Sequence, residues 1–145
     1  MNTDRALVLE FLRGDGKPAA ITSNPLAREL SAELIELDAK QGVALLAFAP
    51  PARFVQGAQV LQGGIVATLL DFAMAFAAHA RLGPEERAFS TATLTVSLLR
   101  AAPPGRYLAR GRILRAGTRL MFAEADLTSE GGESFARASA VMPLL

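Results

Sequence analysis

Apolar and polar residues alternate along most of the second half of the chain with the period of a β-strand. In residues 91–99, apolar residues take one face and hydroxyl-bearing residues the other: Ala92, Leu94, Val96 and Leu98 against Thr91, Thr93, Thr95 and Ser97. The same reasoning, with turns marked by glycine and proline, predicts five further strands. They are expected at residues 32–40, 43–49, 106–115, 119–129 and 133–142.

Two segments have the pattern of helices. Residues 3–12 predict a short amphipathic helix with Thr3 or Asp4 near its N-terminal cap. Residues 64–82 predict a long helix that ends at a Gly-Pro pair. Because the long helix is apolar on nearly all sides, we expect the rest of the protein to surround it.

Charged residues indicate how the last strands pair. Tight turns between them place Arg110 and Arg112 opposite Glu124 and Asp126, and Arg137 opposite Asp126. Such pairs mark the solvated face of an antiparallel sheet. The alternate residues are apolar and are expected to face the long helix: Met121, Ala123, Ala125 and Leu127. The sequence therefore predicts an α+β fold in a single domain, residues 1–145.

The composition excludes several classes of function. The 145 residues carry a net charge of +1, which predicts no binding to nucleic acid or to an anionic membrane. The chain has no cysteine and one histidine, so a thiolate metal site is excluded and no metal centre is expected. The N-terminus lacks a signal peptide, so a cytoplasmic location is expected. A carboxylate inside the long helix disfavours a membrane span, by about 2.5–3.5 kcal/mol.

The long helix carries two candidates for chemistry. At its start, Gly63 and Gly64 leave backbone N–H groups open to a ligand oxygen, as the stabilisation of an oxyanion requires; the alternative is a tight entry turn. Further along, Asp71 is a lone carboxylate that we expect to be buried. It is either a catalytic group or a structural hydrogen-bond acceptor. His79 is expected to be solvated or to interact with the helix end.

The spacing of these two candidates constrains any shared site. Gly63 and Asp71 are eight residues apart, which is about 12 Å along a helix axis, so one scissile carbonyl cannot contact both in one chain. If both act on one substrate, the site is shared between two copies. Residues 91–99 hold no charge and no proline, so this strand could pair with its own copy if it lies at a sheet edge.

These features together resemble the hotdog-fold acyl-CoA thioesterases, in particular the phenylacetate-degradation-type group of the 4-hydroxybenzoyl-CoA thioesterase-like superfamily. The family signature is His-Gly-Gly, a helix reading Thr-Leu-x-Asp, and a strand that opens with Thr or Ser and ends near Leu-Arg-Pro. The corresponding segments here are Gln62-Gly63-Gly64, Thr68-Leu69-Leu70-Asp71 and TLTVSLLRAAP. The match covers residues 26–142.

The resemblance implies a hotdog fold. After an N-terminal helix and loop (1–25), the core (26–145) would be a long helix wrapped by a curved antiparallel sheet of about six strands in the order 1-2-4-5-6-3. It implies a homodimer, possibly doubled to a homotetramer. It also implies hydrolysis of an acyl-CoA thioester, with no cofactor because coenzyme A is part of the substrate.

The resemblance also implies roles for individual residues. Asp71 would be the nucleophile or the general base on water, Gly63 would polarise the carbonyl through its N–H, and the Thr91 hydroxyl would position water or the carboxylate. Gln62 stands where the family usually has His; its amide can donate to the thioester oxygen or hold the loop, but it carries no proton at neutral pH. Positions that contact substrate fall on Gln56, where the family has Asn, and on Gly64.

Two other functions stay open. One is a non-catalytic acyl-CoA-binding or regulatory hotdog protein in which Asp71 is structural. The other is a dehydratase or hydratase, which the absence of His at position 62 disfavours. A loop glycine of the family is replaced by Gln59, and the acyl group is not predicted by any pattern in the sequence.

Overall fold

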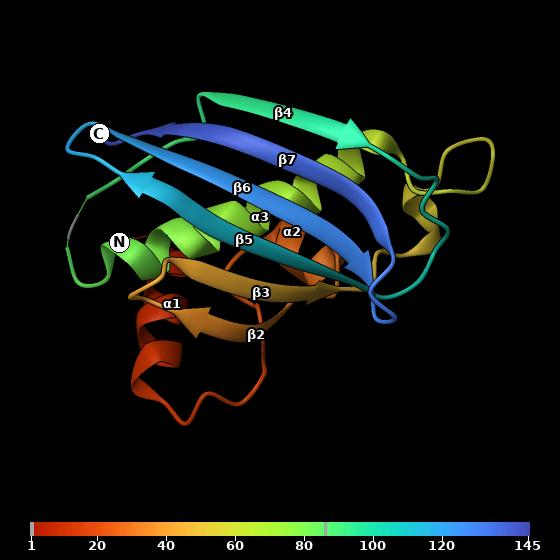
Figure 1. Cartoon of the computed structure of the whole chain (residues 1–145). Coiled ribbons are helices and arrows are strands. Elements are labelled where there is room, and N and C mark those ends of the chain that lie inside the picture. Colours follow the sequence, from red (N-terminus) through yellow and green to blue (C-terminus); the bar gives the residue numbers. More distant parts are fainter. Residues whose placement is uncertain (1, 86) are drawn as a thin grey trace.

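A helix of 20 residues, α3 (Gly63–Leu82), lies across one face of a curved seven-stranded antiparallel sheet (Figure 1). The computed structural model describes residues 2–85 and 87–145. The sheet runs in the order β1-β2-β3-β5-β6-β7-β4. Its strands are β1 (Ala19–Ala20), β2 (Glu33–Asp38), β3 (Val43–Phe48), β4 (Thr93–Leu98), β5 (Tyr107–Ala116), β6 (Leu120–Ser129) and β7 (Ser134–Pro143).

The predicted α+β class and the long helix on an antiparallel sheet are confirmed, but the predicted number and order of strands are wrong. The sheet has seven strands because Ala19 and Ala20 pair with Leu34 and Glu33 at the edge of β2. This addition raises the number of every later strand by one. A strand of two residues is too short to show a period in the sequence.

Two short helices, α1 (Thr3–Arg13) and α2 (Pro25–Glu29), precede the core of the sheet. Thr3 and Asp4 lie next to the cap of α1, as expected; the cap itself is Asn2, whose side chain accepts hydrogen bonds from the N–H groups of Asp4 and Arg5. We expected a loop where α2 forms. The sequence nevertheless contains a typical helix start here: Asn24 caps the helix, and a proline occupies its first turn.

The predicted register of the charged strands is confirmed. Arg110 lies opposite Asp126, Arg112 opposite Glu124, and Asp126 opposite Arg137. Arg137 Nε lies 3.0 Å from Asp126 Oδ1, and Arg112 forms an ion pair with Glu124. These pairs lie on the solvated face of the sheet, where each contributes little to stability but favours this register.

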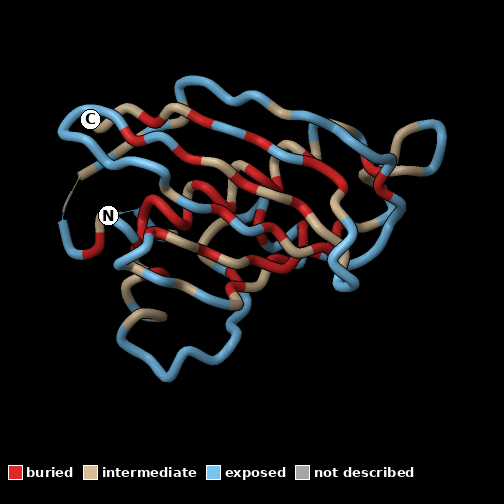
Figure 2. Tube along the Cα trace, in the orientation of Figure 1, coloured by how far each residue is buried: buried red, intermediate tan, exposed pale blue. Residues whose placement is uncertain are grey.

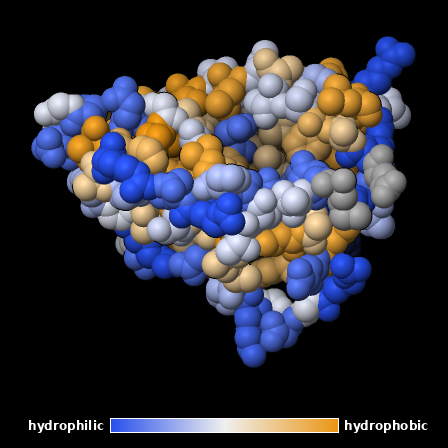
Figure 3. Space-filling model, turned by 180° about the vertical axis from the view of Figure 1, so that it is seen from behind, coloured by the Kyte–Doolittle hydropathy of each residue, from blue (hydrophilic) through white to orange (hydrophobic). Residues whose placement is uncertain are grey.

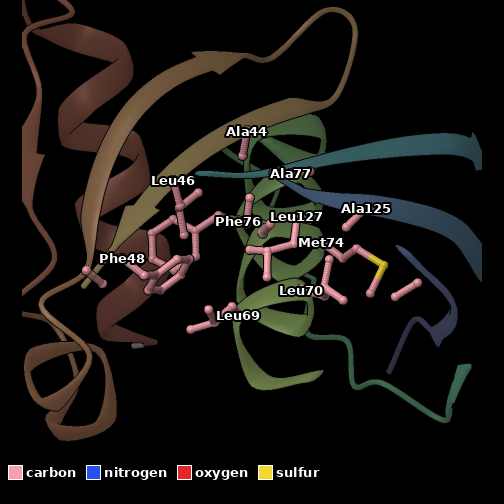
Figure 4. Close-up of a cluster of buried hydrophobic side chains, with 14 of the residues drawn as sticks. Ala44, Leu46, Phe48, Leu69, Leu70, Met74, Phe76, Ala77, Ala125 and Leu127 are labelled. Carbon is pink, nitrogen blue, oxygen red and sulfur yellow. The ribbon is translucent and has the colours of Figure 1, made fainter. Parts of the chain in front are cut away.

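The core lies between the sheet and α3. The residues that we expected to face the helix are at most 2% exposed: Met121, Ala123, Ala125 and Leu127. In Figure 4, side chains of β3, α3 and β6 meet in one apolar cluster, which includes Leu46, Leu70 and Phe76. Although α3 is long and apolar enough to cross a membrane, 56% of its most apolar window is buried inside the protein, as is usual for a core helix.

Candidate active site

One stripe of α3 is not fully covered by the sheet. It is formed by Gly64, Thr68, Asp71 and Ala75, which follow one another at helical spacing and are half-buried or exposed. Seen from behind in Figure 3, apolar residues surround a hollowed part of the surface. Asp71, which we expected to be buried, is instead half-buried, because it lies on this stripe.

The carboxylate of Asp71 is held by a hydroxyl from the segment before β4. Thr91 Oγ1 donates to Asp71 Oδ1 over 2.9 Å. Among the described residues, only this oxygen of the carboxylate accepts a side-chain hydrogen bond, which leaves Oδ2 for another partner. The structure thus brings together the two residues that the resemblance assigned to the carboxylate and the positioning hydroxyl.

The first turn of α3 begins at Gly63. Gln62 occupies the cap position with φ −57° and ψ 135°, and its exposed side chain makes no capping hydrogen bond in the described chain. A Cβ on Gly63 would lie 2.8 Å from Leu98 Cδ1, whereas a Cβ on Gly64 would meet no atom within 4 Å. The first N–H groups of this 20-residue helix carry a partial positive charge. Because Gly63 and Gly64 have no side chains, a ligand oxygen could approach these N–H groups closely.

Gln56 lies in the loop before α3, in the same cavity as Gly63. The cavity has a volume of about 290 Å³, and Leu98 lines its other side. The amide oxygen of Gln56 accepts the N–H of Ala58, so this side chain stabilises its own turn. Gln59, where the resemblance expects glycine, adopts φ 62°, so this turn keeps a left-handed backbone that favours glycine.

A second cavity, of about 540 Å³, begins one helical turn beyond Asp71. Ala75, His79 and Thr91 line it, together with Arg5 of α1 and Phe89. Asp71 and Thr91 thus lie near this cavity, and Gly63 with Gln56 line the other, so a single chain does not bring all four together. Within residues 2–85 and 87–145, no group of three acidic or histidine side chains is placed to hold a metal ion.

The expectation for His79 is wrong. It is 7% exposed, because the ring packs edge-on against Phe76 and at 4.7 Å from the ring of Phe89. Burial lowers its pKa from 6.5 to about 4; the carboxylate of Asp4 acts in the opposite direction, and the charge of Arg5 lowers the pKa too. The sequence shows that His79 lies about two helical turns beyond Asp71. It does not show that Phe89, ten residues later, covers the ring.

We expect His79 to make the free energy of unfolding depend on pH. The unfolded chain binds a proton near pH 6.5 and the folded chain only near pH 4, so the contribution of the neutral ring is complete above pH 6.5 and is lost as the pH falls towards 4. At pH 5 the loss is about 2 kcal/mol. Urea unfolding of the wild type and His79→Phe at pH 7.5 and pH 5 measures it; equal losses in both proteins would contradict the assignment.

Known proteins share this architecture. The profile of the thioesterase superfamily matches residues 58–136. Among solved structures, a phenylacetic acid degradation-related protein of Ralstonia eutropha is 25% identical with a TM-score of 0.80, and the alignment covers 94% of this chain and 98% of that one. A thioesterase family protein of Silicibacter pomeroyi is 26% identical with a TM-score of 0.77, covering 97% and 98%.

The PaaI protein from the phenylacetic acid degradation operon of Escherichia coli has a TM-score of 0.78, covering 99% of this chain and 95% of that one. The two sequences are 16% identical, so the similarity shows a shared fold only. No match was found among curated protein sequences. The superfamily profile covers more than half of the chain, including α3 with Asp71 and all of β4, β5 and β6. The protein belongs to the thioesterase superfamily and has its hotdog fold.

Proposed function

We propose that the protein hydrolyses acyl-CoA thioesters at a site formed by two copies of the chain. The observation that carries this proposal is the half-buried Asp71 carboxylate, held at one oxygen by Thr91 on the uncovered side of α3. Membership of the thioesterase superfamily supports the reaction class. A carboxylate oriented by one hydrogen bond and accessible at its other oxygen suits either attack on a carbonyl or activation of water.

The exposed edge of the sheet supports a dimer. β4 lies at the end of the strand order, and Figure 2 shows it exposed along most of its length. Leu94 and Leu98 are 37% and 56% exposed, and the strand has no charge or proline to protect its edge. Pairing with the same strand of a second copy would cover this edge and these leucines.

Such a pairing would also complete the site. Two identical strands related by a twofold axis run antiparallel, so the start of one lies beside the end of the other. Thr91, with Asp71, stands just before the start of β4, and Gly63 lies against Leu98 at its end. The carboxylate of one copy would then approach the helix N-terminus of its partner, which no single chain achieves.

In the proposed reaction, the thioester oxygen accepts the N–H of Gly63, and this hydrogen bond stabilises the negative charge that develops on it. Asp71 Oδ2 either attacks the carbonyl carbon, so that coenzyme A leaves as a thiolate and water then hydrolyses the mixed anhydride, or it takes a proton from the attacking water. Thr91 fixes the rotamer of the carboxylate in both routes. In this proposal, Gln62 would donate its amide N–H to the substrate.

Mixed subunits test the shared site. We expect Asp71→Asn and Gly63→Pro each to abolish turnover as homodimers. A heterodimer of the two, isolated through different affinity tags, should regain about half of the wild-type rate, because one of its two sites is intact. Release of coenzyme A from an acyl-CoA panel measures the rate, and thiol reagents report it directly since the chain has no cysteine.

The matched control is Gly63→Ala, which adds the same Cβ near Leu98 but keeps the N–H. Proline is compatible with the backbone before it, because Gln62 has ψ 135° and the first helical position tolerates proline. If Gly63→Ala is active and Gly63→Pro is not, the loss of activity is due to the missing backbone N–H of residue 63 rather than to the added Cβ. A heterodimer as inactive as its parents would contradict a site shared between copies.

A further inference from the structure

A second group of exposed apolar side chains lies away from the β4 edge. It is carried by the hairpin of β5 and β6, where Leu114 is 56% exposed and Leu120 and Phe122 are each 39% exposed. Exposed leucines that are scattered singly need no explanation, but three large apolar side chains on one hairpin mark a surface for interaction. We call these three residues, together with Arg115 and Arg119 of the same hairpin, the hairpin patch.

The strand register turns the hairpin patch to the outer face of the sheet, away from α3. In β6, Met121 is buried, so its neighbours Leu120 and Phe122 face outwards. The pairing of β5 with β6 shifts by one residue at this point, so that Leu114 and Arg115 both lie opposite Phe122. A regular strand would turn Arg115 towards the helix; the shift places it on the outer face beside Leu114.

The arginines of the hairpin patch differ from the other arginines of this face. Arg110, Arg112 and Arg137 each form an ion pair with an acidic side chain. Among the described residues, Arg115 and Arg119 form no ion pair, and both are exposed. Their positive charge is therefore not neutralised by a direct partner at the place where they border exposed apolar side chains.

The neighbours of the hairpin patch keep this end of the sheet positive. On the side of β4, its apolar residues line a hollow of about 200 Å³ with hydroxyl-bearing residues of β4 and β7. On the other side, the N–H of Ile113 donates to the carbonyl oxygen of Gly42, so the turn between β2 and β3 lies at the same end of the sheet (Figure 1). That turn adds the exposed Lys40, and its one acid, Asp38, accepts the N–H of Gln41.

We propose that the hairpin patch binds an anionic lipid surface, with its apolar side chains in the interface and its arginines at the phosphate head groups. Apolar burial and attraction to anionic lipids act together where cations flank exposed apolar side chains. The expectation of no membrane contact rests on the net charge of +1. That sum includes the ion pairs of the whole molecule and does not show where the unpaired cations gather.

Two other occupants fit the hairpin patch less well. A second copy that contacted the patch through a twofold axis would place its arginines against the same arginines. A small acidic protein would cover one patch, whereas the proposed β4 dimer presents two, because antiparallel pairing of identical strands keeps both outer faces on one side of the sheet. An extended surface can contact both patches at once, so that two weak contacts act together.

Sedimentation with vesicles tests the proposal without any assay of turnover. We expect the full chain to bind phosphatidylcholine vesicles that contain about 30% phosphatidylglycerol, to leave pure phosphatidylcholine unbound, and to be released as salt rises from about 0.05 to about 0.5 M. Arg115→Gln combined with Arg119→Gln should lower the partition at least about tenfold. The matched control is Arg110→Gln combined with Arg137→Gln, which removes the same charge from the same face outside the patch and should lower the partition far less.

Fluorescent labels at single positions test the apolar contact. Because the chain has no cysteine, Leu114→Cys and Leu26→Cys each accept one environment-sensitive dye. Leu26 is the matched control, since it is 45% exposed but lies on α2, outside the patch. On anionic vesicles, the emission of the dye at position 114 should move to shorter wavelength, and that of the dye at position 26 should stay unchanged. Leu114→Ser should weaken binding to the vesicles, and Leu26→Ser should not.

Each other outcome overturns the inference. No binding to anionic vesicles, or equal binding to anionic and neutral vesicles, would do so. Equal losses in the two arginine variants would show a general attraction rather than a contact of the hairpin patch. If the wild type leaves vesicles unbound and Leu114→Ser lowers the oligomeric state in sedimentation velocity, the patch instead joins copies of the chain. None of these results depends on hydrolysis, so the proposed thioesterase activity stands or fails separately.

Discussion

Asp71→Asn is expected to lower kcat for acyl-CoA hydrolysis by at least about 100-fold, the usual contribution of a positioned general base. A nucleophilic role would give a larger loss, because an amide forms no acyl intermediate. Asparagine has nearly the shape of aspartate and its amide oxygen can still accept the Thr91 hydroxyl, so the fold is expected to persist. Thiol release under saturating acyl-CoA measures the loss, and size-exclusion chromatography checks that the variant has the same oligomeric state as the wild type.

Asp15→Asn is the matched control, since this carboxylate lies in the exposed loop after α1 and, among the described residues, pairs only with Lys17. It removes the same charge and should leave the rate unchanged. Full activity in Asp71→Asn would refute the proposed role of the carboxylate. Wild-type protein that binds acyl-CoA tightly without hydrolysing it would instead favour the non-catalytic alternative, in which Asp71 only fixes the segment before β4.

Gly111→Ala is expected to cause the largest loss of stability, about 3 kcal/mol or more in the free energy of unfolding. A Cβ on Gly111 would lie 2.2 Å from the carbonyl oxygen of Ala73, so the backbone of α3 sits directly on β5 at this point. No rotamer change relieves a contact with backbone, and the helix or the strand must move. Urea unfolding of the two proteins measures the difference.

Gly105→Ala provides the control, because a Cβ there would meet no atom within 4 Å. The contact also concerns function. Ala73 is two residues beyond Asp71 on α3, so a displaced helix would alter the distance between Asp71 and Thr91. A Gly111→Ala protein as stable as the wild type would contradict the close approach of helix and strand.

Much of the fold was predictable because local patterns report burial. Period-two alternation identified the long strands β5, β6 and β7, and the opposite charges on Arg112 and Glu124 set their register. The apolar run after Gly63 identified α3. β1 escaped prediction because two alanines show no period, and α2 because a helix of five residues is too short for one.

The candidate site was predictable only in part. The unusual carboxylate in an apolar helix singled out Asp71, and the resemblance added Thr91, which the structure places 2.9 Å from it. The burial of His79 and Arg5 was not predicted, because it depends on contacts with segments distant in the sequence: Phe89 covers the ring, and the end of α3 accepts the guanidinium. Neither contact has a local signature.

The order of apolar and polar residues by itself determined the class of fold, the central helix and the pairing of the long strands, because each depends on which side of a local element is hidden from water. Only the tertiary structure decided that β4 forms an open edge, that Thr91 reaches Asp71, and that a cavity lined by Arg5 and His79 begins one turn beyond. These features arise where residues far apart in the chain meet, and the packing of the whole sheet on α3 sets those distances.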